Sequence, residues 1–113
     1  MPVKNRVIQA YRAASSYKSQ REIEADIFRQ AIDSLLAAGG AEPVQQVKAV
    51  ADNRRLWMAV QAIITDPENA LPMELRASII SISLSIQREM NRENPNLDFL
   101  VAMNENMVSG LLN

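Results

Sequence analysis

The residue types that most often carry acid–base, thiol and metal chemistry are missing from this chain, which has no histidine and no cysteine in 113 residues. An enzyme built on it would have to use carboxylates, lysine or tyrosine. Glu22 and Asp26 form a carboxylate pair at helical spacing, but the acids of this segment fall on a polar helix face. The serines between Ser78 and Ser85 have no base to activate them. No glycine-rich phosphate loop or nucleophile elbow is present. The residues therefore predict no enzyme, no metal site and no cofactor.

Charge is spread unevenly along the chain, although the formal net charge is only −1. The first 21 residues contain no acid but five bases, which are Lys4, Arg6, Arg12, Lys18 and Arg21. Such a segment is either an arm for a partner or a membrane surface, or a terminal helix with a solvated basic face. The second interpretation is favoured because the apolar stripe beside the bases is narrow. No signal peptide and no membrane-spanning run is predicted.

The elements that would position these residues are helices, because glycine and aromatic residues are few and good helix formers are many. A short helix is predicted over residues 4–15. Ser19 and Glu22 form a capping box that predicts the start of a second helix. Gly39 and Gly40 predict its end, since glycine readily takes the left-handed conformation that closes a helix.

Prolines divide the rest of the chain. Pro43 and Pro72 are each placed to begin a helix. Residues 78–86 alternate almost like a strand, yet strong helix formers flank them and no second strand is available for pairing, so a helix is predicted. The fold class is thus all-α: one domain over residues 1–113, a small bundle of four main helices plus the short N-terminal one. Its centre is an antiparallel hairpin, 43–65/72–93.

Both helices of this hairpin carry apolar residues on two sides. On the first, Arg54, Trp57 and Met58 share one stripe, and the opposite stripe holds Ala49, Leu56, Val60 and Ile63. On the second, the main stripe is Leu75, Ile79, Ile82, Ile86 and Met90, and the far side holds Ala77, Ile80 and Leu84. A small bundle must cover such second sides, leave a groove or dimerise.

Trp57 can fill the core or anchor an interface, where tryptophan is enriched. Arg54 lies in the same stripe one turn earlier, which favours a core or rim position for Trp57. The stripe opposite Trp57 and the far side of the next helix are therefore the predicted binding surface.

Several of these residues, taken in order, resemble the FlaF family of flagellar biosynthesis regulators, which occurs in alphaproteobacteria. The resemblance runs from Tyr11 to Glu89, and the last helix carries little of it. It rests on Arg21-Glu22-Ile23-Glu24, on Asn53-Arg54-Arg55-Leu56-Trp57, and on Asn69-Ala70-Leu71-Pro72 followed by Leu75-Arg76-Ala77.

The resemblance implies a cytoplasmic helical protein that acts on flagellin after transcription and in its export. Flagellin's ends are amphipathic helices that need cover before export. The leading hypothesis is therefore an export chaperone that binds flagellin helix-in-groove and promotes flagellin synthesis, type III secretion and flagellum assembly. Its predicted partner-binding residues are Arg54, Leu56, Trp57, Val60, Arg76, Ile80, Leu84 and Met103.

Two alternatives stay open. The protein could be a post-transcriptional regulator that acts on flagellin messenger RNA directly, through its basic N-terminal segment, or through a second flagellar regulator; direct RNA contact is the less favoured form. It could also be a homodimer that hides the same apolar surface. A monomer or weak dimer without a membrane partner is expected.

Overall fold

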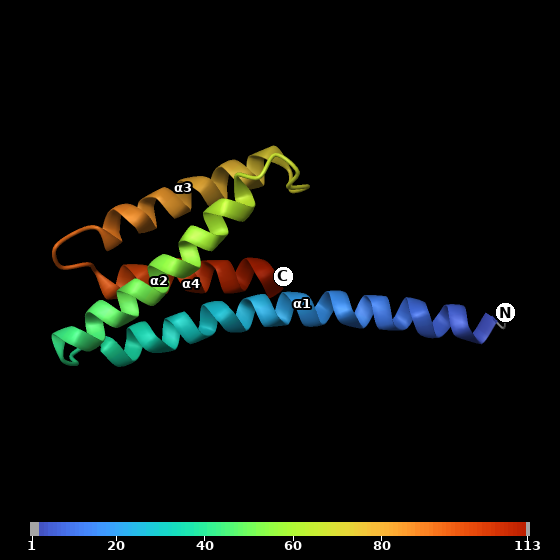
Figure 1. Cartoon of the computed structure of the whole chain (residues 1–113), viewed down its shortest axis with the longest axis horizontal. Coiled ribbons are helices and arrows are strands. Elements are labelled where there is room, and N and C mark those ends of the chain that lie inside the picture. The colour runs from blue at the N-terminus through green and yellow to red at the C-terminus, as the bar shows by residue number, and fades with distance from the viewer. Residues whose placement is uncertain (1–2, 113) are drawn as a thin grey trace.

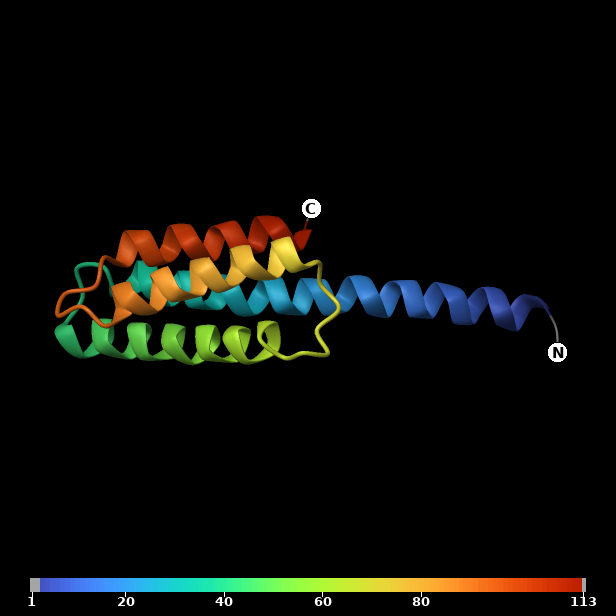
Figure 2. The same cartoon turned by 90° about the horizontal axis from the view of Figure 1, so that it is seen from above.

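The computed structural model describes the backbone of residues 3–112 and the side chains of residues 6–9 and 21–110. Over this part of the chain it consists of helices and connecting turns, without a strand. The helices pack as a bundle (Figures 1 and 2), so the predicted fold class is confirmed. The strand-like stretch of residues 78–86 is helical, as predicted. The helices are α1 (Val3–Ala38), α2 (Pro43–Ile64), α3 (Met73–Met90) and α4 (Leu97–Leu112).

The first helix is longer than predicted. The segment 4–15 and the segment after Ser19 are both helical, but they are continuous in the 36 residues of α1. The boundary expected at Ser19 was wrong, since no glycine or proline interrupts this stretch. The side chain of Ser19 lies outside the described residues. The end at Gly39 and Gly40 was predicted correctly: Gly40 has a φ of 80° and turns the chain toward α2.

The hairpin of α2 and α3 is present and antiparallel, as Figure 2 shows. Pro43 is the first residue of α2, and Pro72 immediately precedes α3. Side chains of the connecting turn stabilise it. The backbone N–H of Leu71 donates to the Asn69 side chain at 2.9 Å, and the amide nitrogen of Asn69 donates to the carbonyl of Ile63 at 3.1 Å. The turn is therefore tied back to the end of α2.

Each helix has two neighbours in the bundle. The most extensive packing joins α1 to α4, followed by α2 with α3 and α1 with α2, while α3 touches α4 least. It follows that α2 and α4 stand diagonally across the bundle. The hairpin is thus less central than predicted, and α3 is the most peripheral of the four helices in the bundle.

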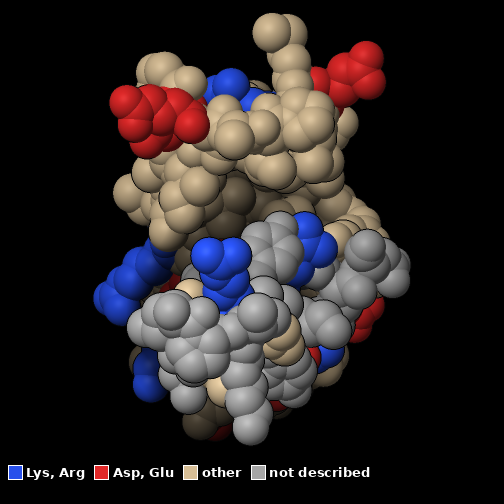
Figure 3. All heavy atoms as spheres, turned by 90° about the vertical axis from the view of Figure 1, so that its right-hand side faces the viewer, with Lys and Arg blue, Asp and Glu red and all other residues tan. Residues whose placement is uncertain are grey.

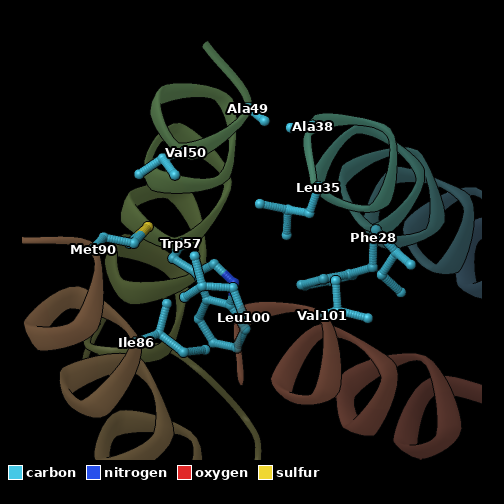
Figure 4. Close-up of a cluster of buried hydrophobic side chains, with 11 residues drawn as sticks. Phe28, Leu35, Ala38, Ala49, Val50, Trp57, Ile86, Met90, Leu100 and Val101 are labelled. Carbon is cyan, nitrogen blue, oxygen red and sulfur yellow. The ribbon is translucent and has the colours of Figure 1, made fainter. Parts of the chain in front are cut away.

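All four helices contribute side chains to one hydrophobic core. Trp57 is 0% exposed, and its ring meets that of Phe28 edge-on, with the centroids 5.8 Å apart. Figure 4 shows the core side chains pointing from the four helices toward one another. The core comprises Phe28, Ile32, Leu35, Ala38, Ala49, Val50, Trp57, Ile86, Met90, Leu100 and Val101.

A chain of polar side chains runs through this core. The indole N–H of Trp57 donates to Asn104, and the amide nitrogen of Asn104 donates to Asn53. The amide nitrogen of Asn53 in turn lies 3.4 Å from the sulfur of Met90. The two asparagines are 0% exposed, and among the described residues no buried side-chain nitrogen or oxygen lacks a partner. The polar groups are therefore compatible with burial.

The N-terminal half of α1 projects beyond the rest of the bundle (Figures 1 and 2). The molecule measures 62 × 30 × 19 Å, and this projection accounts for its length. A helix rises about 1.5 Å per residue, so the 16 residues of α4 are less than half as long as the 36 residues of α1. The rest of α1 extends past the end of α4. We call residues 3–20 the arm. Its Val7 and Ile8 are 63% and 42% exposed.

Candidate partner-binding surface

Polar contacts between α2 and α3 define which sides of the two helices face each other. The side-chain amide of Gln87 donates to that of Gln61 midway along the hairpin, and also to Ser83 at 3.2 Å. Arg54 and Arg76 reach across at the two ends. Gln61, Gln87, Arg54 and Arg76 thus mark the sides on which the two helices meet. A neighbouring position on the helical wheel lies either toward the core or on the outside of the hairpin.

Arg54 and Arg76 cap each other's helices. A terminal nitrogen of Arg54 donates to the carbonyl of Met90, the last residue of α3, at 3.0 Å. Arg76 donates through Nε to the carbonyl of Ile64, the last residue of α2, at 3.2 Å, and through Nη2 to the backbone carbonyl of Asp66. Cations are favourable at helix C-termini, where carbonyls lack partners. Both arginines thus have an internal role, and their predicted contact with a partner stays a prediction.

On α3 the core side and an exposed apolar side are separate. Ser83, Ile86 and Met90 are buried. An apolar row on the outside has the 4-3-4 spacing of a helix seam: Met73, Ala77, Ile80 and Leu84. Met73 is 83% exposed and Leu84 is 47% exposed. The predicted apolar far side of this helix is therefore separate from its core side, and the bundle leaves most of it exposed.

A matching row on α2 continues this surface. Met58 lies one turn before Gln61, and Leu84 lies one turn before Gln87. Because the helices are antiparallel and meet at these two glutamines, both positions turn to the side away from the core. Met58 is 59% exposed. We call this surface the outer hairpin face; it consists of Val47, Ala51 and Met58 on α2 with Met73, Ala77, Ile80 and Leu84 on α3.

One end of the outer hairpin face deepens into a pocket of about 410 Å³. It lies between α2 and the turn that joins α3 to α4. Apolar side chains form much of its wall, and Arg54, Arg92 and Glu93 add charge. The surface therefore offers an apolar groove together with a pocket that can take a side chain.

The other stripe of α2 belongs to a different side of the bundle. Leu56 lines a shallow depression of about 230 Å³ with Ile27 and Ala31 of α1. Val60 is half-buried and packs against the core. The structure therefore does not bring Leu56 and Val60 together with Ile80 and Leu84, as the predicted groove requires. The α2 residue on the same side as Leu84 is Met58, which the sequence interpretation assigned to the Trp57 stripe.

Two further predicted contact residues lie inward. Trp57 is fully buried, so it takes no direct part in any surface of this conformation. Met103 is half-buried on α4 and packs against the core. Asn53 and Asn104 received no role in the sequence interpretation, although both are central to the core. The signal that could have found Asn53 is its position between Val50 and Trp57 in a regular 3-4 spacing.

The described residues contain no group of three or more acidic side chains that could hold a metal ion. In the same part of the chain, no helix combines the length and apolar character needed to cross a bilayer.

Comparison with known proteins identifies a family. A family model described as "Flagellar protein FlaF" matches residues 7–111, which include nearly all of α4. No curated protein and no solved structure matches the chain.

Proposed function

Because the chain belongs to the FlaF family of flagellar proteins and so has a role in flagellum biogenesis, we propose that it binds flagellin before export. An amphipathic terminal helix of flagellin lies on the outer hairpin face, helix-in-groove. By covering that helix, the protein acts as an export chaperone and promotes the synthesis and secretion of flagellin.

The observation that carries the proposal is the exposed apolar row on α3. Ile80 and Leu84 lie in a helix seam that no other described helix covers, and Met58 flanks it from α2. Regular 4-3-4 spacing of apolar residues is what a second helix needs in order to pack alongside. An amphipathic helix of flagellin fits this surface because its apolar stripe has the same periodicity.

The size of the surface favours a reversible complex. Complete burial of a Leu, Ile or Met side chain contributes about 1.5–3 kcal/mol, and those of Met58 and Leu84 are already about half covered. A few such half-covered anchors yield a gross gain at or below the low end of the roughly 4–15 kcal/mol that association costs. The remaining contacts of the helix must supply the surplus, so binding is moderate and compatible with release for export.

The test is co-purification of flagellin with single-residue variants. Ile80→Asp and Leu84→Asp place a charge in the seam, and each should abolish recovery of flagellin while circular dichroism stays helical. Ser78→Asp is the matched control, because Ser78 is exposed on the opposite flank of α3. Recovery of flagellin with both seam variants at the wild-type level would contradict the proposal.

A further inference from the structure

The arm of α1 is a helix without a packing partner among the described residues. Its 18 residues correspond to about 27 Å of helix. Isolated helices of this length are marginal in water, because most helical stability in proteins comes from packing. Val7 and Ile8 present apolar surface to solvent there, and Arg6 is exposed beside them. The arm is therefore a surface that some partner must cover.

The charge of the arm limits which kinds of surface can pack against it. Residues 3–20 hold four bases, Lys4, Arg6, Arg12 and Lys18, and no acid. A partner must offer negative charge together with apolar surface.

The α2–α3 turn offers both. Residues 63–76 contain three acids, Asp66, Glu68 and Glu74, against one base, Arg76, whose guanidinium is held by the backbone carbonyls of Ile64 and Asp66. All three acids are exposed, and none forms an ion pair among the described residues. In the same segment Ile63 and Leu71 are 65% and 41% exposed. The turn is thus an acidic, apolar counterpart of the basic, apolar arm.

The arm and the turn lie at the same end of the molecule. In Figure 2 the turn stands at the level where α1 leaves the bundle. Figure 3 looks at this end: acidic side chains stand on both sides of its upper part, where the turn lies, with a hollow below. The arm runs away from the turn of its own chain, so its tip cannot fold back onto it without breaking α1.

We propose that this end is the interface of a head-to-head dimer, in which each arm lies on the α2–α3 turn of the second copy. A two-fold axis across the long axis sets the two arms antiparallel and overlapping. The tip of each arm, about 27 Å from its own bundle, then reaches the level of the other copy's turn. Both contacts are identical, so the assembly closes with two chains.

The same observations argue against RNA as the occupant. RNA would neutralise the bases of the arm, but the acids of the turn at the same end would repel it. It would also leave Ile63 and Leu71 uncovered. A second copy satisfies the arm and the turn together, and this inference holds independently of flagellin binding.

The experiment uses the purified full chain alone, with mass measured by sedimentation equilibrium over a range of protein and salt concentrations. The expected result is a dimer that dissociates as salt rises. Two charge-reversed variants follow: an arm variant with Lys4→Glu and Arg6→Glu, and a turn variant with Glu68→Lys and Glu74→Lys. Each alone should dimerise at least ten-fold more weakly than the wild type.

Mixing the two variants gives the decisive result. In the mixed dimer, the reversed arm of one chain meets the reversed turn of the other, and the remaining contact is wild-type. Opposite charges therefore face each other at both contacts, and an equimolar mixture should regain the dimer. Arg88→Glu and Glu93→Lys, exposed residues toward the far end of the hairpin, are the matched controls and should leave the dimer unchanged.

Three results would overturn the proposal. They are a wild-type chain that stays monomeric at every concentration, a dimer that neither variant weakens, and a mixture no more dimeric than its components. Circular dichroism of each variant establishes that a lost dimer is not a lost fold.

Discussion

The indole nitrogen of Trp57 on α2 donates a hydrogen bond of 2.7 Å to the side-chain oxygen of Asn104 on α4, across the diagonal of the bundle. The amide nitrogen of Asn104 donates to the side-chain oxygen of Asn53 at 2.7 Å, so one asparagine of α4 binds two side chains of α2. Since α2 and α4 are not neighbours, these hydrogen bonds fix the position of one helix relative to the other along the bundle axis. Apolar packing alone would allow the two helices to slide.

The first prediction concerns this link. Asn104→Ala leaves the Trp57 indole N–H and the Asn53 side-chain oxygen without partners in the core. Each orphaned group should lower the free energy of unfolding by about 1–3 kcal/mol. Urea unfolding followed by fluorescence measures the loss. Asn106→Ala, at an exposed position on the same helix, should change the free energy by no more than about 0.5 kcal/mol.

The second prediction uses Trp57, the single tryptophan of the chain, as a probe. Because its side chain is 0% exposed, acrylamide should quench its fluorescence poorly in the native state and strongly in urea. Addition of a tryptophan-free flagellin segment should leave the quenching of Trp57 unchanged. A large change on binding would instead mean that Trp57 contacts the partner.

The third prediction concerns the reciprocal caps. Arg54→Ala removes the donor at the end of α3, and Arg76→Ala removes the donors at the end of α2. Each should cost about 1 kcal/mol of unfolding free energy and speed hydrogen exchange in the last turn of the other helix. Arg55→Ala is the control: its side chain is 83% exposed and lies 3.8 Å from Asp52, a contact of little energetic value.

The fourth prediction separates the two sides of α2. Met58→Asp should impair flagellin recovery as Leu84→Asp does, with little loss of stability, because Met58 is 59% exposed on the outer hairpin face. Leu56→Asp should instead lower the melting temperature, because Leu56 packs against the core. Thermal unfolding and co-purification of both variants distinguish these effects. If Leu56→Asp removed binding without destabilisation, the α1 side of α2 would be the contact surface.

Local rules predicted the elements well. Pro43, Pro72 and the glycine pair after α1 act on the backbone within a few residues, and the structure follows them. The helical assignment of residues 78–86 was also correct, because the flanking helix formers and the lack of a second strand outweighed the alternation. Membership of the FlaF family was predictable from ordered residue blocks, and the family match extends through nearly all of α4.

The arrangement of the surfaces was less predictable. A helical wheel gives the angles between side chains, but it does not say which neighbouring helix each side meets. Leu56 and Val60 were grouped with the far side of α3 because each of these sets is the second apolar side of its own helix. In the structure the α2 residue that lies beside the far side of α3 is Met58, and Asn53 occupies the buried seam of α2.

Because α1 is continuous, the number of residues between the arm and the core determines the direction in which the arm's side chains point. A single uninterrupted helix transmits angle as well as distance, so inserting one alanine near residue 20 would rotate the whole arm by about 100° around its axis. Inserting seven would lengthen it by about 10 Å yet nearly restore its original orientation. The orientation of the arm relative to the bundle thus depends on the number of residues that separate the two.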